Sequence, residues 1–264
     1  MEKLKNRNLC ILQARMGSTR LPGKVLLRVG GLALLEYQIT RLRLAKKIDK
    51  IIVATSVDKP NDRIERLCQK IGIECFRGSE DDVLDRFYQC SLKHPQYGNI
   101  IRTTGDCPLI DSAVIDEVIT FFEENNYDYA SNALKPTFPD GMDVEILKKS
   151  VLREAAEKAI LPSDREEVNE YIFRQNKYKK GNLAAPHDWS HFRLTVDEKE
   201  DFEVIKFLIE NSKITDGYLH YISVLTKHPE VMLKNMHIKR NVGLLKTLAK
   251  DKIFLKQQKR YSPR

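Results

Sequence analysis

Three basic residues surround a glycine-rich turn near the N-terminus, in the segment ARMGSTRLPGK over residues 14–24. Arg15, Arg20 and Lys24 could form charge-assisted hydrogen bonds with phosphate oxygens, and the backbone N–H groups of such a turn also bind phosphate. The spacing matches neither the P-loop pattern nor the G-x-G-x-x-G dinucleotide pattern. Charge and glycine alone therefore favour phosphate binding only slightly over an exposed turn at Pro22-Gly23.

Two aspartates follow segments that we expect to be strands. Asp106 lies in TGDCPLID after residues 99–104, and Asp197 lies in LTVDEKED after residues 192–196. Carboxylates at strand ends, together with substrate phosphate oxygens, suit Mg²⁺. Taken singly, Asp106 reads better as a turn residue and Asp197 as a helix N-cap. Combined with the basic turn, the two carboxylates make magnesium–nucleotide chemistry the leading interpretation.

A third polar cluster lies in FPDGMDVEIL, where Asp140, Asp143 and Glu145 follow one another closely. Asp143 and Glu145 would share one face of a strand, and such paired carboxylates can hold sugar hydroxyls or a metal. The alternative is a solvated edge that follows a common Pro-Asp-Gly turn. His187 and His191 are interpreted as structural or exposed residues, because Pro186 and Trp189 disfavour a helix that would present both as ligands.

The hydrophobic pattern alternates between strand-like and helix-like segments, which predicts an α/β fold with a mostly parallel sheet covered on both faces. In such sheets, ligands bind beyond the carboxyl ends of the strands. The first half predicts strands at 8–13, 50–55, 73–76 and 99–104, and helices at 34–45, 61–71, 83–92 and 111–122 with Asp111 as N-cap. The second half predicts extended segments at 127–130, 141–146, 183–185 and 192–196, and helices at 151–160, 163–174, 202–209 and 218–225. The helix at 163–174 is expected to begin with a capping box of Ser163 and Glu166.

The composition is that of an ordinary water-soluble protein, with 42% hydrophobic and 31% charged residues in a chain of 264. No apolar run approaches the roughly 18–20 residues that a membrane span needs. The charged N-terminus predicts that there is no signal peptide. Five scattered cysteines, none in a C-x-x-C pair, argue against a disulfide framework or a zinc site. These features together predict a cytoplasmic location.

The net charge of +8 arises in the C-terminal segment. Residues 238–264 hold nine basic residues and one acidic residue, which accounts for the whole net charge. Such a segment can hold a polyanion or a membrane surface. We favour the simpler interpretation, a terminal helix with a solvated lysine face.

The basic turn and the loops that follow it also match a known pattern. The segment LQARMGSTRLPGKVL resembles the N-terminal signature of the sugar-acid cytidylyltransferases, including the acylneuraminate and Kdo enzymes. It is closest to the branch called spore coat polysaccharide biosynthesis protein F-like. The resemblance continues through RTTGDCPLID, YASN, FPDGMDVE, DREEVNEYI and FRLTVDEKEDFE, and so covers about residues 8–210.

The resemblance implies a Rossmann-like nucleotidyltransferase fold, related to the GT-A glycosyltransferases. We expect a nucleotidyltransferase domain over residues 1–237, with an inserted acceptor and dimerisation segment at about 127–185, and a basic tail over 238–264. The implied activity is transfer of CMP from CTP to an acidic sugar with release of pyrophosphate, using Mg²⁺, for surface polysaccharide or glycan biosynthesis. A cytoplasmic homodimer without a membrane span is expected, and nucleic acid is not an expected partner.

The resemblance also assigns roles to individual residues. Arg15, Lys24, Asp106 and Asp197 would be catalytic, and the two aspartates would hold the magnesium ion. The nucleotide would be bound by Leu12, Ala14, Arg15, Gly17, Ser18, Arg20 and Lys24, with Thr55, Ser79 and Arg86 on the cytidine side. The acceptor would face Asn132, Asp140, Asp143 and Glu145.

Three alternatives stay open. A GT-A glycosyltransferase would normally show an Asp-x-Asp motif where this chain has Gly105-Asp106-Cys107. An enzyme that joins UTP or GTP to a sugar 1-phosphate would have a longer basic loop. A binding protein whose basic tail docks a polyanion is the third. Gln13 stands where the sialate and Kdo enzymes have proline, and Cys107 also departs from them, so the acceptor is less certain than the nucleotide.

Overall fold

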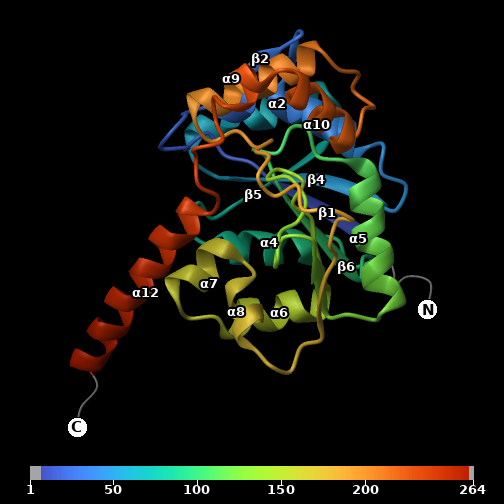
Figure 1. Cartoon of the computed structure of the whole chain (residues 1–264). Coiled ribbons are helices and arrows are strands. Elements are labelled where there is room, and N and C mark those ends of the chain that lie inside the picture. Colours follow the sequence, from blue (N-terminus) through green and yellow to red (C-terminus); the bar gives the residue numbers. More distant parts are fainter. Residues whose placement is uncertain (1–6, 262–264) are drawn as a thin grey trace.

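The protein folds around a seven-stranded sheet with the order β5-β4-β1-β6-β8-β7-β9, seen in the computed structural model (Figure 1). The structure describes residues 7–261; residues 1–6 and 262–264, including Arg264 of the basic segment, lie outside the described part. The strands are β1 (Asn8–Gln13), β4 (Lys50–Ser56), β5 (Glu74–Gly78), β6 (Asn99–Thr104), β7 (Tyr129–Ser131), β8 (Glu145–Lys148) and β9 (Lys180–Asn182).

Most neighbouring strands are parallel, as predicted. β1 pairs in parallel with β4 and β6, β4 with β5, and β7 with β9, whereas β8 runs antiparallel to its neighbours β6 and β7. The carboxyl ends of β1, β4, β5 and β6 therefore meet at one edge of the sheet. A short hairpin of β2 (Arg28–Val29) and β3 (Leu32–Ala33) lies outside this sheet.

Helices cover both faces of the sheet, and β1 shows why. Cys10 and Leu12 contribute to one hydrophobic core, while Leu9 and Ile11 contribute to the other, because side chains alternate along a strand. The first core is completed by α2 (Leu34–Leu42), α3 (Asp62–Lys70), α5 (Ser112–Glu124), α9 (Lys199–Glu210), α10 (Tyr218–Lys227) and α11 (Pro229–Met232). The second is completed by α4 (Val83–Leu92), α6 (Lys149–Lys158) and α8 (Glu170–Arg174).

The elements predicted in the first half are confirmed, with ends that differ by a few residues. Asp111 is the N-cap of α5, and its side chain accepts hydrogen bonds from the N–H groups of Ala113 and Tyr218, both within 2.9 Å. Short 3₁₀ turns, η1 (Lys24–Leu26) and η2 (Lys59–Asn61), complete this half. In the second half, the extended segment expected at 141–146 forms a strand only from Glu145, where β8 begins. The strand expected at 183–185 is wrong, because β9 ends at Asn182 and the next three residues are not in a strand.

The predicted single helix at 163–174 is wrong. The chain forms two short helices, α7 (Pro162–Glu167) and α8, because Val168 between them adopts a positive φ of 68°. The predicted capping box is also wrong, since Ser163 lies inside α7. Its hydroxyl donates to a carboxylate oxygen of Asp251 at 2.6 Å.

The predicted strand at 192–196 is replaced by an extended segment with one isolated bridge, between Asp140 and Arg193. Its backbone groups bond to two loops rather than to a strand. Leu194 N–H donates to the carbonyl of Asp140 at 2.7 Å, and Val196 N–H donates to the carbonyl of Asp106 at 2.8 Å. The segment thus links the loop after β6 to the loop before β8.

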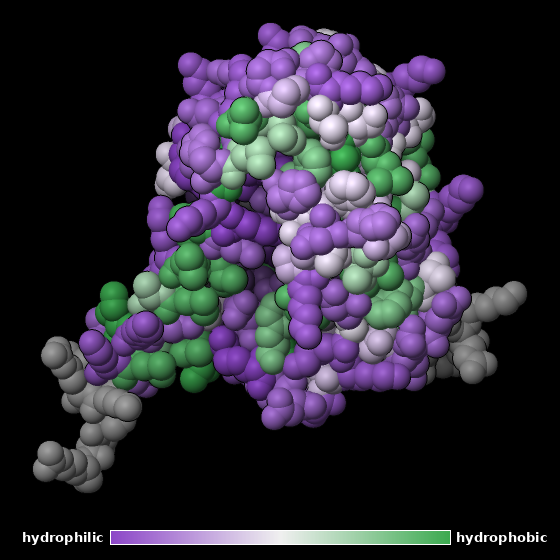
Figure 2. Space-filling model, in the orientation of Figure 1, coloured by the Kyte–Doolittle hydropathy of each residue, from purple (hydrophilic) through white to green (hydrophobic). Residues whose placement is uncertain are grey.

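The C-terminal segment forms α12 (Val242–Tyr261), a long helix that projects from the body (Figure 1). Midway along its length it packs against α7 through the bond between Ser163 and Asp251 and through an ion pair of Lys250 with Glu166. Apolar and basic side chains mix over its surface (Figure 2), with Leu245 and Ile253 exposed. No helix in the described part of the chain is long and apolar enough to cross a membrane.

Candidate active site

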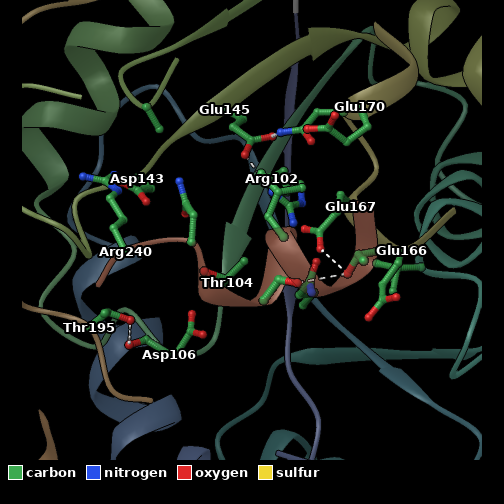
Figure 3. A pocket seen from close by; sticks show the side chains of 18 of the residues that line it. Arg102, Thr104, Asp106, Asp143, Glu145, Glu166, Glu167, Glu170, Thr195 and Arg240 are labelled. Atoms are coloured by element: carbon green, nitrogen blue, oxygen red, sulfur yellow. Dashed lines mark hydrogen bonds and ion pairs between the residues drawn. The ribbon is translucent and has the colours of Figure 1, made fainter. Parts of the chain in front are cut away.

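A cavity of about 960 Å³ opens where the carboxyl ends of β1 and β6 meet. Its lining comes from the loop after β1, the loop after β6, the segment from Asp140 to Glu145, the helices α7 and α8, and the start of α12 (Figure 3). Eight residues predicted for the site line it: Arg15, Arg20, Arg86, Asp106, Asp140, Asp143, Glu145 and Asp197. The structure therefore brings together side chains that are up to 182 residues apart.

The backbone of the basic turn is fixed by its own hydrogen bonds. Gly23 N–H donates to the Met16 carbonyl at 3.0 Å, and Leu21 N–H donates to the Ser18 hydroxyl at 3.3 Å. Gly23 has a φ of 72°, which a residue with a side chain rarely adopts. The turn passes into η1, where Lys24 begins the 3₁₀ turn and lies largely buried.

Two cations of this turn contact the two aspartates predicted to hold a metal, Asp106 and Asp197. Lys24 Nζ lies 3.0 Å from Asp106 Oδ2 and 2.8 Å from Asp197 Oδ1. Arg20 Nη2 lies 2.8 Å from the same Asp197 oxygen. Arg15 instead pairs with Glu80 at 3.1 Å and has a side chain that is 46% exposed.

The charges in this cluster shift each other's pKa. Burial acts to lower the pKa of Lys24, but the carboxylates of Asp106 and Asp197 outweigh it and raise that pKa above its usual value. Burial likewise acts to raise the pKa of Asp106, but the Lys24 ammonium and hydrogen bonds from the Thr104 hydroxyl and the backbone together outweigh it and lower that pKa to about 2. Both groups therefore stay charged near neutral pH.

Arg193 connects the aspartates on both sides of the cavity, and sequence reasoning missed it. Its guanidinium lies 2.6 Å from Asp140 Oδ2, 3.1 Å from Asp197 Oδ2 and 2.8 Å from Asp201 Oδ1. Asp201 in turn accepts the N–H groups of Asp197 and Glu198 at the start of α9. The four-residue spacing of Arg193, Asp197 and Asp201 was the available signal, but it matters only once the 192–196 segment is placed.

The carboxylates on the other side of the cavity are each held by an arginine. Arg240 forms ion pairs with Asp143 and, at 3.6 Å, with Asp140. Arg102 Nη1 lies 2.7 Å from Glu145 (Figure 3). Burial, followed by repulsion from Asp143, raises the pKa of Asp140 to about 6 against the opposing effect of Arg240 and Arg193.

The remaining predicted residues are placed differently. Leu12, Ala14 and Thr55 are buried beside the cavity rather than lining it, and Gly17 and Ser18 lie in the turn itself. The Ser79 carbonyl accepts a hydrogen bond from Arg86 at 2.5 Å, so this serine orients a lining residue.

Asn132, predicted to face the acceptor, is buried. Its side-chain amide donates to the Met142 carbonyl at 2.7 Å and accepts from the Val144 N–H at 2.9 Å. It therefore shapes the loop that carries Asp143.

The loop before β8 must approach the 192–196 segment closely. Gly141 has a φ of 101°, and a Cβ there would lie 2.6 Å from the carbonyl carbon and oxygen of Leu194. Only glycine fits this contact without a backbone shift. The contact sets Asp140 against Arg193 and so joins the two sides of the cavity.

Asp106 and Asp197 are close enough together to share a divalent metal ion. Asp106 and Asp197 each place an oxygen within 3.0 Å of one position, the Lys24 nitrogen. No group of three or more His, Cys, Asp and Glu side chains suited to a metal occurs among the described residues. Mg²⁺ is commonly held by one or two carboxylates and completed by water and phosphate oxygens. The pair fits an ion of this kind that takes its other ligands from a nucleotide.

Comparisons with known proteins agree with this geometry. The family model described as "Cytidylyltransferase" matches residues 9–253. The spore coat polysaccharide biosynthesis protein SpsF of Bacillus subtilis is 37% identical over 217 residues, which cover 78% of this chain and 88% of that protein. The family match extends past residue 237 into α12, so it includes Arg240.

Solved structures give the same result. A cytidylyltransferase from Leptospira borgpetersenii superposes with a TM-score of 0.83 at 33% identity, over 89% of this chain and 99% of that one. A CMP:2-keto-3-deoxy-manno-octonic acid synthetase complexed with CTP superposes with a TM-score of 0.60, over 78% and 99% of the two chains. At 17% identity, the second match supports the fold alone. The predicted family resemblance and the predicted fold are confirmed.

Proposed function

The chain belongs to the cytidylyltransferase family, and we propose that it transfers CMP from CTP to an acidic sugar, with release of pyrophosphate, for polysaccharide or glycan biosynthesis. The observation that carries the proposal is the meeting of Arg20 and Lys24 with Asp106 and Asp197. Arg20 and the two aspartates line a large polar cavity, and Lys24 lies behind them, outside the lining. Cations for phosphate and carboxylates for a divalent metal are the two parts that triphosphate chemistry needs.

We assign the triphosphate to the basic turn. Arg15, Arg20 and Lys24 carry three positive charges on a backbone that is already ordered, so the backbone needs little reorganisation when the nucleotide binds. Arg86 lines the same part of the cavity, with its Nε unpaired among the described residues, and is available to the nucleotide. Asp106 and Asp197 would hold Mg²⁺, which would neutralise charge on the phosphates when bound.

The reaction follows from this placement. The acceptor hydroxyl attacks the α-phosphorus in line, a new P–O bond forms while the hydroxyl proton is released to solvent, and the bond to the pyrophosphate oxygen breaks. Arg15, Arg20 and Lys24 bind the negative charge that moves onto the leaving pyrophosphate. Asp140, Asp143 and Glu145 face the opposite side of the cavity, where they are positioned to accept hydrogen bonds from sugar hydroxyls.

Two further expectations belong to this proposal. The cavity also extends to α7, α8 and α12. We assign the acceptor to this part of the cavity, where α7 and α8 belong to the expected acceptor and dimerisation segment at 127–185. The homodimeric state and the boundary at residue 237 stay predictions. The compact basic turn continues to disfavour an enzyme that uses UTP or GTP with a sugar 1-phosphate, and the single aspartate in Gly105-Asp106-Cys107 disfavours a glycosyltransferase.

The proposal predicts a product that can be identified directly. We expect purified protein with CTP, Mg²⁺ and a panel of sugar acids to release pyrophosphate in step with one acceptor, and mass spectrometry to detect the CMP ester of that acceptor. UTP and GTP with sugar 1-phosphates form a second panel, which tests for the uridylyl- or guanylyltransferase alternative. Nucleotide-sugars without a triphosphate form a third panel, which tests for a glycosyltransferase. Turnover of either of these panels in place of CTP would overturn the proposal.

A further inference from the structure

The two aspartates proposed to hold the metal are already neutralised by the turn proposed to hold the triphosphate. Asp197 Oδ1 contacts both Lys24 Nζ and Arg20 Nη2, each at 2.8 Å, and its Oδ2 contacts Arg193 at 3.1 Å. Asp106 Oδ2 contacts Lys24 at 3.0 Å. Both carboxylates thus have cationic partners from the protein itself.

A divalent metal ion and the Lys24 ammonium cannot both occupy this position. A metal such as Mg²⁺ lies about 2.0–2.1 Å from its carboxylate oxygens, which would place it against the ammonium that contacts the same oxygens. The like charges would repel strongly at such a distance, particularly because Lys24 is largely buried. Metal binding therefore requires Lys24 to leave the two aspartates.

The turn is built so that its side chains can leave while its backbone stays. The hydrogen bonds that order the turn, from Gly23 to Met16 and from Leu21 to Ser18, involve no atom of the Lys24 or Arg20 side chain. The Lys24 side chain has four methylene carbons joined by rotatable bonds, so its ammonium can change position without moving the backbone of the turn. A triphosphate on the turn offers both cations new anionic partners.

We propose that Lys24 and Arg20 are counter-ions that block the metal site until a triphosphate draws them away, so that metal and nucleotide bind cooperatively and the metal binds poorly alone. The inference rests on the proposed roles of the turn and of the two aspartates. By linkage, each ligand raises the affinity of the other by the same factor. Lys24 thereby has a second role, which sets the order of binding, besides its proposed contact with phosphate.

The test measures Mn²⁺ binding to the nucleotide-free protein, by the electron paramagnetic resonance signal of free Mn²⁺. We expect weak binding by the wild type and about tenfold tighter binding by Lys24→Met, a factor within the usual range of coupling between two sites. Arg20→Met removes the contacts to Asp197 and Glu198 but leaves Lys24 on both aspartates, and is expected to show a smaller gain. It also serves if Lys24→Met does not fold, which a thermal melt would reveal.

Arg15→Met is the matched control, because Arg15 carries the same charge in the same turn but pairs with Glu80. We expect it to leave Mn²⁺ affinity near the wild-type value. Equal gains in Arg15→Met and Lys24→Met would mean a general charge effect and would overturn the proposal. So would Lys24→Met and Arg20→Met variants that bind Mn²⁺ no better than the wild type. Neither result depends on which nucleotide the enzyme uses, so this test can fail while the proposed function stands.

Discussion

Replacing Lys24 with methionine is expected to lower kcat/KM for CMP transfer by about 100- to 1000-fold, the range found when one preorganised charge contact to a transition state is removed. The methionine keeps most of the length of the buried stem but removes the ammonium that contacts Asp106 and Asp197. The variant loses its contact with the leaving pyrophosphate even though its metal affinity is expected to rise. Steady-state kinetics of pyrophosphate release measure the effect.

Lys46→Met is the control for this prediction, because Lys46 is an exposed lysine outside the cavity lining. It should retain wild-type kinetics. The thermal midpoints of both variants should be measured beside the kinetics, so that loss of activity is separated from loss of folded protein. A Lys24→Met enzyme within about twofold of the wild-type kcat/KM would show that Lys24 does not act on the transition state.

The second large effect is a loss of stability on substitution of Arg240. This residue belongs to the C-terminal segment that we predicted, from its charge, to be a helix with a solvated face. Arg240→Met removes a cation from Asp140 and Asp143, and the Asp143 carboxylate already adds to the effect of burial in raising the pKa of Asp140. Removing one partner of a partly buried ion pair leaves uncompensated charge, so we expect the free energy of unfolding to fall by about 2 kcal/mol. Urea denaturation at neutral pH measures this loss.

A double variant tests the cause. Adding Asp143→Asn to Arg240→Met removes the carboxylate that the first substitution left unpaired, and should recover a large part of the lost stability. A double variant no more stable than Arg240→Met would show that the ion pair is not the reason.

Deleting residues 238–264 should lower both stability and activity. Deleting only 256–264 keeps Arg240, Thr247 and Asp251 and should lower them far less.

The sequence was sufficient to predict the position of a site residue where that residue follows the carboxyl end of a strand. Asp106 follows β6, and parallel strands bring their carboxyl ends together, so its meeting with the turn after β1 could be foreseen. Asp197 lies at the same edge, as expected, even though the segment before it is not a strand. The Val196 N–H donates to the Asp106 carbonyl, and this bond holds Asp197 beside the loop after β6. Local rules also gave most helices of the first half and the N-cap at Asp111.

Each missed arginine has a partner that is distant in sequence, although Arg193 also contacts the nearby Asp197 and Asp201. Arg102 meets Glu145, Arg193 meets Asp140, and Arg240 meets Asp143, and none of these pairs forms a pattern that spacing can show. Ser163 was assigned to a local capping box, but its hydroxyl bonds Asp251, 88 residues away. Nor could charge counting reveal that the basic C-terminal segment lines the cavity with its first turns.

The central claim is that this turn and these aspartates bind CTP, and a nucleotide titration tests it most directly. Calorimetric titrations of the wild type and of Lys24→Met with CTP, UTP, GTP and ATP, with and without Mg²⁺, would measure affinity for each. We predict that CTP binds the wild type at least about tenfold more tightly than the others, a difference near 1.4 kcal/mol, and that Lys24→Met binds it more weakly. Tighter binding of another nucleotide, or no triphosphate binding at all, would contradict the account.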